Sequence, residues 1–159
     1  MPGVEFMYKL ESELVKEFRS TLFGNANTLS IIAVAPEFNY VEGRVDLIAI
    51  NNDGDLVAFE AKLTRWRSAL NQAYRNSSFA HYSYVVLPKT ILENVIGHID
   101  EFHRRGIGLC VFDSSSGIKV EVPAIRRKPI QPWLTSTAMN YISDGRRECA
   151  ISSFYSNSH

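Results

Sequence analysis

Residues 43–63, GRVDLIAINNDGDLVAFEAKL, constrain the fold of this chain more than any other stretch. Two runs of β-branched and aliphatic residues, 45–50 and 56–63, flank the polar residues 51–55. An Asp-Gly pair between such runs is the strongest short-range signal of a β-hairpin. Because both faces of the two runs are apolar, we expect two antiparallel strands inside a sheet that is covered on both sides.

Three charged residues, Asp46, Glu60 and Lys62, interrupt these apolar runs. Charges on buried strands cost free energy unless they are paired or bind a metal. A three-residue loop over 52–54, with Gly54 in the left-handed conformation, places Asp46 directly opposite Glu60, with Lys62 on the same side. A two-residue turn at Asp53 and Gly54 would instead send the two carboxylates to opposite faces.

Asp46 on one strand, followed by Glu60-Ala61-Lys62 on the next, resembles the signature of the PD-(D/E)XK nuclease superfamily. Val45 stands where the written motif has proline. The resemblance implies an α/β protein of the restriction-endonuclease-like fold. We expect an αβββαβ core over residues 4–87, with a central mixed sheet flanked by helices and an extra C-terminal helix and strands.

The resemblance also implies a metal-dependent nuclease that hydrolyses phosphodiester bonds in DNA. Oxygen ligands from Asp46, Glu60 and the backbone carbonyl of Ala61 suit Mg²⁺ or Mn²⁺. Such a metal stabilises charge on the phosphoryl oxygens and activates a water. Lys62 would orient or deprotonate that water, or offset negative charge in the transition state.

Two further candidates lie on predicted helices. Glu11 falls on the apolar stripe of a helix over 4–23. It is either a stripe-edge residue or, as in many members of the superfamily, a carboxylate that faces the hairpin and helps to bind metal. Gln72 lies on a helix over 66–80, and the sequence at 72–75, QAYR, is similar to the superfamily helix whose glutamine lines the site. The alternative is an exposed helical glutamine.

The remaining pattern predicts strands over 29–35, 82–87, 109–112 and 118–122, and helices over 91–105 and 133–142. Residues 36–40 are predicted to link the first strand to the hairpin. We expect a nuclease-like core domain over 1–122. Residues 123–159 form a C-terminal extension that packs on this core and ends in a polar, disordered tail.

Charge gives no argument for a nucleic-acid partner, because 17 basic and 17 acidic residues balance. Local basic residues suited to phosphate contacts are nevertheless present: Arg65, Arg67, Arg75, Arg126, Arg127 and Lys128. No helix-turn-helix or zinc-finger pattern is evident. We therefore expect DNA, with RNA as an open alternative, to be recognised through its structure or through a partner protein. A homodimer would serve to cut two strands.

Other interpretations of the three charged residues remain open. The same fold could act without cleavage, as a module that binds nucleic acid or protein in a larger complex. The three charges could also form a salt-bridged group that only holds the hairpin. A further alternative is an unrelated α/β domain in which the Glu-x-Lys pattern is accidental. The sequence contains no Walker loop, no GxSxG motif and no Cys/His metal spacing. It has no apolar window long enough to span a membrane and no signal-peptide pattern, so we expect a cytoplasmic protein.

Overall fold

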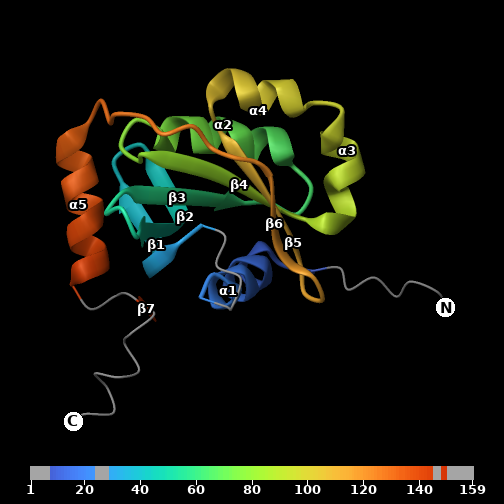
Figure 1. Ribbon diagram of the computed structural model, residues 1–159, viewed down its shortest axis with the longest axis horizontal. Helices are drawn as coiled ribbons and strands as arrows, with labels where there is room; N and C mark the ends of the chain where they lie inside the picture. Colours follow the sequence, from blue (N-terminus) through green and yellow to red (C-terminus); the bar gives the residue numbers. More distant parts are fainter. Residues whose placement is uncertain (1–7, 24–28, 145–147, 150–159) are drawn as a thin grey trace, which may run out of the picture.

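The computed structural model describes residues 8–23, 29–144 and 148–149. Its centre is a seven-stranded sheet in the order β6-β5-β4-β3-β2-β1-β7 (Figure 1). The strands are β1 (Ile31–Tyr40), β2 (Gly43–Asn51), β3 (Leu56–Ala61), β4 (Tyr82–Pro88), β5 (Gly108–Asp113), β6 (Gly117–Val122) and β7 (Glu148–Cys149). The helices are α1 (Glu11–Thr21), α2 (Trp66–Asn76), the 3₁₀ turn η1 (Lys89–Ile91), α3 (Leu92–Ile96), α4 (Ile99–Arg105) and α5 (Pro132–Ser143).

The sheet is mixed, as predicted. β1, β2 and β3 pair antiparallel, β3, β4 and β5 pair parallel, and β6 returns antiparallel to β5. Figure 1 shows α1 on one face, α2, α3 and α4 on the other, and α5 beside β1 and β2. The expected α/β fold class, a mixed sheet flanked by helices with an additional C-terminal helix, is confirmed.

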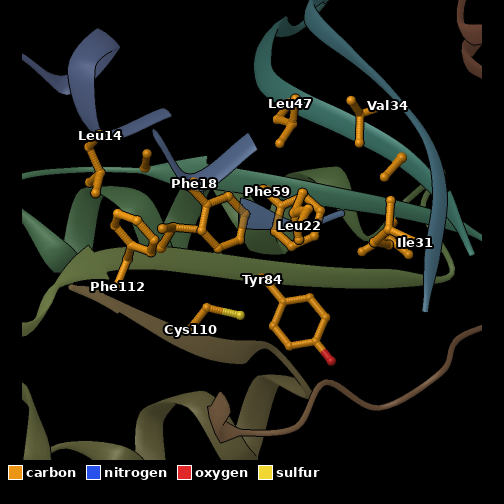
Figure 2. Packing of buried hydrophobic residues seen from close by; sticks show 14 residues of the cluster. Leu14, Phe18, Leu22, Ile31, Val34, Leu47, Phe59, Tyr84, Cys110 and Phe112 are labelled. Atoms are coloured by element: carbon orange, nitrogen blue, oxygen red, sulfur yellow. The ribbon is translucent and has the colours of Figure 1, made fainter. Parts of the chain in front are cut away.

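Buried apolar clusters hold the helices on the sheet. Beneath α1, Figure 2 shows Phe18 between Phe59 and Phe112. The Phe18 ring centroid lies 5.1 Å from that of Phe59 and 6.1 Å from that of Phe112, both edge to face. A second cluster joins α2, α3 and α4 to β4 and β5. A third packs Ala138 and Ile142 of α5 against β1, β2 and β3.

The hairpin between β2 and β3 has the predicted three-residue loop. Gly54 adopts a positive φ of 79°, the conformation that favours glycine. Asn51 donates its backbone N–H to the carbonyl of Asp55 at 3.0 Å, and the register continues to Leu47 opposite Phe59. The odd-numbered loop and the register that follows from it are therefore confirmed.

Helix boundaries differ from the prediction in several places, and the first helix ends at Thr21 and not at residue 23. The first helix begins at Glu11, because the backbone N–H of Leu10 donates to the Glu13 carboxylate at 3.0 Å and caps the helix there. The predicted start at residue 4 lies outside the described residues. The second helix ends at Asn76 and not at residue 80. The predicted helix over 91–105 is divided near Gly97, a poor helix former, into α3 and α4.

The predicted link over residues 36–40 is wrong, because β1 continues through Pro36 to Tyr40. The backbone N–H of Asn51 donates to Asp55, the residue before β3, so the odd-numbered backbone groups of β2 face β3 and the even-numbered ones face β1. Pro36 lies opposite the odd-numbered Leu47. Its nitrogen therefore points away from β2, and its missing N–H removes no bond from this ladder.

The C-terminal extension packs on the core through α5 and the segment before it. Thr135 donates its hydroxyl to the carbonyl of Phe79 at 2.6 Å, and Arg126 pairs with Asp55 at 2.8 Å. The division at residue 122 stays a prediction, and the predicted tail over 152–159 lies outside the described residues. None of the helices in the described part of the chain is long and apolar enough to cross a membrane.

Candidate active site

The two carboxylates meet where the β2–β3 ladder opens. Continuing the register one position beyond Leu47 and Phe59 places Asp46 opposite Glu60. In an antiparallel ladder, hydrogen-bonded and non-hydrogen-bonded residue pairs alternate, so the next hydrogen-bonded pair would join Ala61 to Val45. The Ala61 N–H instead donates to Asp46 Oδ2 at 2.9 Å. The Asp46 carboxylate thus takes the place of the next backbone hydrogen bond between β2 and β3, and this bond holds it beside Glu60.

Glu60 is almost completely buried, with 1% of its surface exposed. Its Oε1 accepts a hydrogen bond from Asn76 Nδ2 at 2.9 Å, and Asn76 Oδ1 in turn accepts one from the Tyr40 hydroxyl at 3.0 Å. Burial and then the neighbouring charge and hydrogen bond of Asp46 raise the pKa of Glu60 to about 8, against the opposing effects of Asn76 and Lys62. At neutral pH without a cation, Glu60 is therefore mostly protonated.

Lys62 brings a positive charge to this end of the hairpin. Its ammonium group is near enough to lower the pKa of Glu60. It also lies 3.6 Å from Glu11 Oε1, and both side chains are partly exposed. Glu11 therefore lies on the side of α1 that faces the hairpin and contacts it through Lys62. Its predicted role as a metal ligand stays a prediction.

The role expected for Gln72 at the site stays a prediction. Gln72 is half-buried on α2, and within the described residues no hydrogen bond joins it to the three charged residues of the hairpin. Asn76, one helical turn later, contacts Glu60. The signal for Asn76 was present in the sequence, because it continues the buried stripe of Ala69 and Ala73 with a polar residue.

The donor set suits a hard divalent cation. Asp46 and Glu60 supply only oxygen, and a bound cation would replace the proton that Glu60 otherwise keeps. In the part of the chain that the structure describes, no group of three or more His, Cys, Asp or Glu side chains could hold a metal. Two carboxylates with a backbone carbonyl and waters fit Mg²⁺ or Mn²⁺, which retain several waters in protein sites.

A groove of about 250 Å³ opens beside Asp46. Glu11 and Arg19 of α1 line one wall, and Glu37, Arg44 and Asp46 line the other. Glu37 has a positive φ of 54°, which is uncommon for a residue other than glycine and marks a strained backbone at the groove.

Among the predicted phosphate-binding residues, Arg67 and Arg126 form ion pairs within the protein. Arg67 pairs with Glu101 at 3.2 Å, and its guanidinium lies over the Trp66 ring, 4.2 Å from the centroid. Arg126 makes two hydrogen bonds to Asp55, at 2.8 and 2.9 Å, at the closed end of the hairpin. These bonds lower the pKa of Asp55. Arg126 therefore lies at the opposite end of the hairpin from Asp46 and Glu60.

Three of the other predicted basic residues come together. Arg75, Arg127 and Lys128 line a second groove of about 410 Å³, together with the half-exposed Tyr74. Arg127 lies over the Tyr74 ring, 5.6 Å from its centroid, and donates a hydrogen bond to the backbone carbonyl of Arg105. Arg65 precedes α2 and is exposed. The six basic residues thus do not form one continuous surface.

Comparison with protein-family models finds no match, and comparison with curated proteins finds none either. Among solved structures, a protein of unknown function from Silicibacter pomeroyi is similar, with a TM-score of 0.62 and 12% identity. This match covers 86% of this chain and 87% of that one. At this identity the likeness concerns the fold.

Two further solved structures match more weakly. A repair endonuclease from Pyrococcus abyssi has a TM-score of 0.39 and 20% identity, over 57% of this chain and 46% of that one. A complex of EndoMS with double-stranded DNA has a TM-score of 0.39 and 16% identity, over 72% of this chain and 49% of that one.

Proposed function

We propose that this chain is a metal-dependent nuclease that hydrolyses phosphodiester bonds in DNA. The observation that carries the proposal is the pairing of Asp46 with the buried Glu60 at the point where the β2–β3 ladder opens. Two apposed carboxylates are costly in an apolar sheet unless a cation binds between them. Lys62, close enough to act on Glu60, adds the ammonium group that hydrolysis can use.

Each residue has a definite part in this proposal. When bound, Mg²⁺ or Mn²⁺ supplies charge stabilisation and an activated water. Asp46 and Glu60 would hold the cation, and Asn76 orients the Glu60 carboxylate through the bond to Oε1. Lys62 would either take a proton from the attacking water, which requires its neutral amine form, or, as the ammonium, hold positive charge near the phosphoryl oxygens. Its contact with Glu11 limits where the ammonium group can move.

The same site does not account for recognition of a particular sequence. We propose that the substrate is selected by its structure, with ends, flaps, branches and single strands as candidates, or by a partner protein. Arg75, Arg127 and Lys128 gather in one groove and are the sequence-predicted residues best placed to contact phosphates together. RNA as substrate and a homodimer as the active form belong to the same proposal as alternatives to be tested.

The experiment is a cleavage assay on DNA with Mg²⁺, Mn²⁺ or EDTA. We expect the wild-type protein to cut with either metal and not with EDTA. Lys62→Ala should retain the fold and lose cleavage, because the lysine acts on the water and not on the metal. The matched control is Lys119→Ala, which removes an exposed lysine from β6. Cleavage by Lys62→Ala at the wild-type rate would contradict the assignment of the site.

One observation favours the alternative of a module that binds without cutting. The Lys62 ammonium already has a carboxylate partner in Glu11, so the charged residues could form a salt-bridged group that only stabilises the hairpin. Binding of DNA without cleavage in either metal would support this alternative. The same assay therefore separates the two functions.

A further inference from the structure

Tyr40 is connected to the carboxylate pair although it lies on a different strand. It is at the end of β1, opposite Gly43 of β2. Its half-buried ring packs edge to face on Phe79, with ring centroids 5.0 Å apart, and stacks on Phe38 at 6.3 Å. These two contacts limit how the ring can turn. Its hydroxyl group is therefore held at one place, 3.0 Å from Asn76 Oδ1.

Asn76, the last residue of α2, connects Tyr40 to Glu60 and is 1% exposed. The oxygen and nitrogen ends of a side-chain amide have nearly the same shape, so its hydrogen bonds decide which end faces Glu60. Burial, and then the charge of Glu60, raise the pKa of Tyr40, so its hydroxyl keeps a proton to donate. Among the described residues, Asn76 Oδ1 is the only acceptor bonded to this hydroxyl. Tyr40 therefore turns the amide oxygen toward itself and the amide nitrogen toward Glu60.

The orientation of this amide determines which form of Glu60 it favours. The nitrogen end can only donate, and it donates to Glu60 Oε1 at 2.9 Å. A donor stabilises a charged carboxylate more than a neutral carboxyl group, and Asn76 accordingly opposes the raised pKa of Glu60. The reversed amide would present its oxygen, which repels a carboxylate and accepts a hydrogen bond from a protonated carboxyl group. The orientation seen in the structure is the one that suits a cation-binding Glu60.

We propose that Tyr40 is a positioning residue of the site: its hydroxyl fixes the amide of Asn76, and the amide in turn holds Glu60 as a ligand for a divalent cation. The bond from Asn76 occupies Oε1, so the other oxygen of Glu60 is left for a cation shared with Asp46. Tyr40 and Asn76 are 36 positions apart, and no sequence pattern relates them. The inference rests on the proposed function for the cation, but not on cleavage.

A double-mutant cycle on Mn²⁺ binding, measured by isothermal titration calorimetry without DNA, tests this inference. Tyr40→Phe keeps the ring and removes the hydroxyl, and should weaken binding about three- to tenfold, the factor for one lost neutral hydrogen bond. Asn76→Ala should weaken it about 10- to 100-fold, as loss of a residue that orients a metal ligand does. In the Asn76→Ala protein, Tyr40→Phe should have no further effect, because it acts through Asn76. Tyr82→Phe, at a half-buried position of β4 opposite Val57, is the matched control and should bind as wild type does.

A second measurement needs no metal and follows the amide itself. In EDTA, the side-chain amide protons of Asn76 are observed by NMR in wild type, Tyr40→Phe and Tyr82→Phe. We expect one of these protons to exchange slowly with solvent in wild type, because it is buried and bonded to Glu60. Tyr40→Phe should speed this exchange at least about threefold, and Tyr82→Phe should leave it unchanged. A purely structural contribution of Tyr40 would lower the melting temperature without changing the Asn76 signals.

The outcomes separate this inference from the proposed function. If Tyr40→Phe binds Mn²⁺ as wild type does, or weakens binding without changing the Asn76 signals, the inference is overturned whether or not the protein cuts DNA. The same holds if Tyr40→Phe weakens binding equally with and without the Asn76 amide. If both measurements give the expected result but wild type does not cut with Mn²⁺, the role of Tyr40 stands and the nuclease assignment falls. If wild type binds no Mn²⁺, both are wrong.

Discussion

Asp46 accepts a backbone hydrogen bond within the hairpin and is also a proposed metal ligand. Its Oδ2 accepts the Ala61 N–H at 2.9 Å, and this bond fixes the carboxylate next to Glu60. We expect Asp46→Ala to abolish Mn²⁺ binding in isothermal titration calorimetry, because one of the two paired carboxylates that would hold the cation is lost. Asp53→Ala, in the exposed loop of the same hairpin, is the control. Equal binding by wild type and Asp46→Ala would place any metal elsewhere.

Glu60 makes the stability of the metal-free protein depend on pH. Its pKa is raised from 4.5 to about 8 by burial and by Asp46. Between these values the unfolded chain has released the proton and the folded chain retains it, so the free energy of unfolding falls as pH rises. One proton corresponds to at most about 1.4 kcal/mol per pH unit.

Urea unfolding in EDTA from about pH 5 to about pH 8 measures this slope. We expect Glu60→Gln, which cannot release a proton, to lack the Glu60 contribution and to lose less stability than wild type across this window. Other titrating groups, such as His81 with its lowered pKa, act in both proteins and cancel in the difference. Glu42→Gln, at an exposed position, is the control. Identical slopes for wild type and Glu60→Gln would contradict the raised pKa.

At the scale of single elements, α1 connects the core to the site. Leu14 and Phe18 anchor the helix, and Glu11 at its first turn contacts Lys62. If Glu11 serves the site, Glu11→Gln should weaken Mn²⁺ binding or slow cleavage with little change in melting temperature. Glu13→Gln is less suitable as a control because Glu13 caps the helix; Glu17→Gln, one turn along, is exposed and does not cap it.

A second substitution, Glu11→Leu, tests the alternative that Glu11 has no role at the site. If Glu11 is only a stripe-edge residue, Glu11→Leu should raise the melting temperature by extending the apolar face of α1 and leave metal binding and cleavage unchanged. Measuring melting temperature and metal affinity on the same two variants decides between these cases. The 3.6 Å contact with Lys62 shows that Glu11 faces the hairpin, which is compatible with either case.

At the scale of the whole molecule, the described residues 123–144 of the C-terminal extension contact the predicted core. A chain that ends at Val122 loses α5, the Thr135 bond to Phe79 and the Arg126 pair with Asp55. It also exposes the cluster that Ala138 and Ile142 cover. We expect this truncated chain to lack a cooperative thermal transition in circular dichroism, whereas a chain that ends at Asp144 should keep one. Similar melting curves for the two would show that residues 1–122 fold alone.

Substrate choice is also a property of the whole molecule. The described basic residues are divided between separate grooves and internal ion pairs, and none of them belongs to a dedicated recognition element. Comparing cleavage of linear duplex, single-stranded, flap and four-way-junction DNA of scrambled sequence should therefore reveal a preference for structure, with rates that fall steeply with salt. Cutting at one fixed sequence in every structure would show that this expectation is wrong.

Local features of the sequence were sufficient to predict the core of this site. The register of the hairpin follows from a loop of three residues and a side-chain period of two, so Asp46 opposite Glu60 could be predicted without knowing any other part of the chain. The buried stripes of α1 and α2 follow in the same way from helical periodicity. The continuation of β1 through Pro36 was missed, because a proline is tolerated only when its nitrogen faces away from the neighbouring strand.

Contacts between elements that are distant in the sequence were decided only by the tertiary structure. Asn76 of α2 hydrogen-bonds to Glu60, and the Tyr40 hydroxyl of β1 donates to Asn76. The way α2 packs on the sheet places Asn76, and not Gln72 one helical turn earlier, in contact with Glu60. Arg44 and Arg19 share a groove with Asp46 although no local pattern relates them. Periodicity determines which side of an element a residue occupies, whereas the distance between two elements depends on how their buried side chains pack.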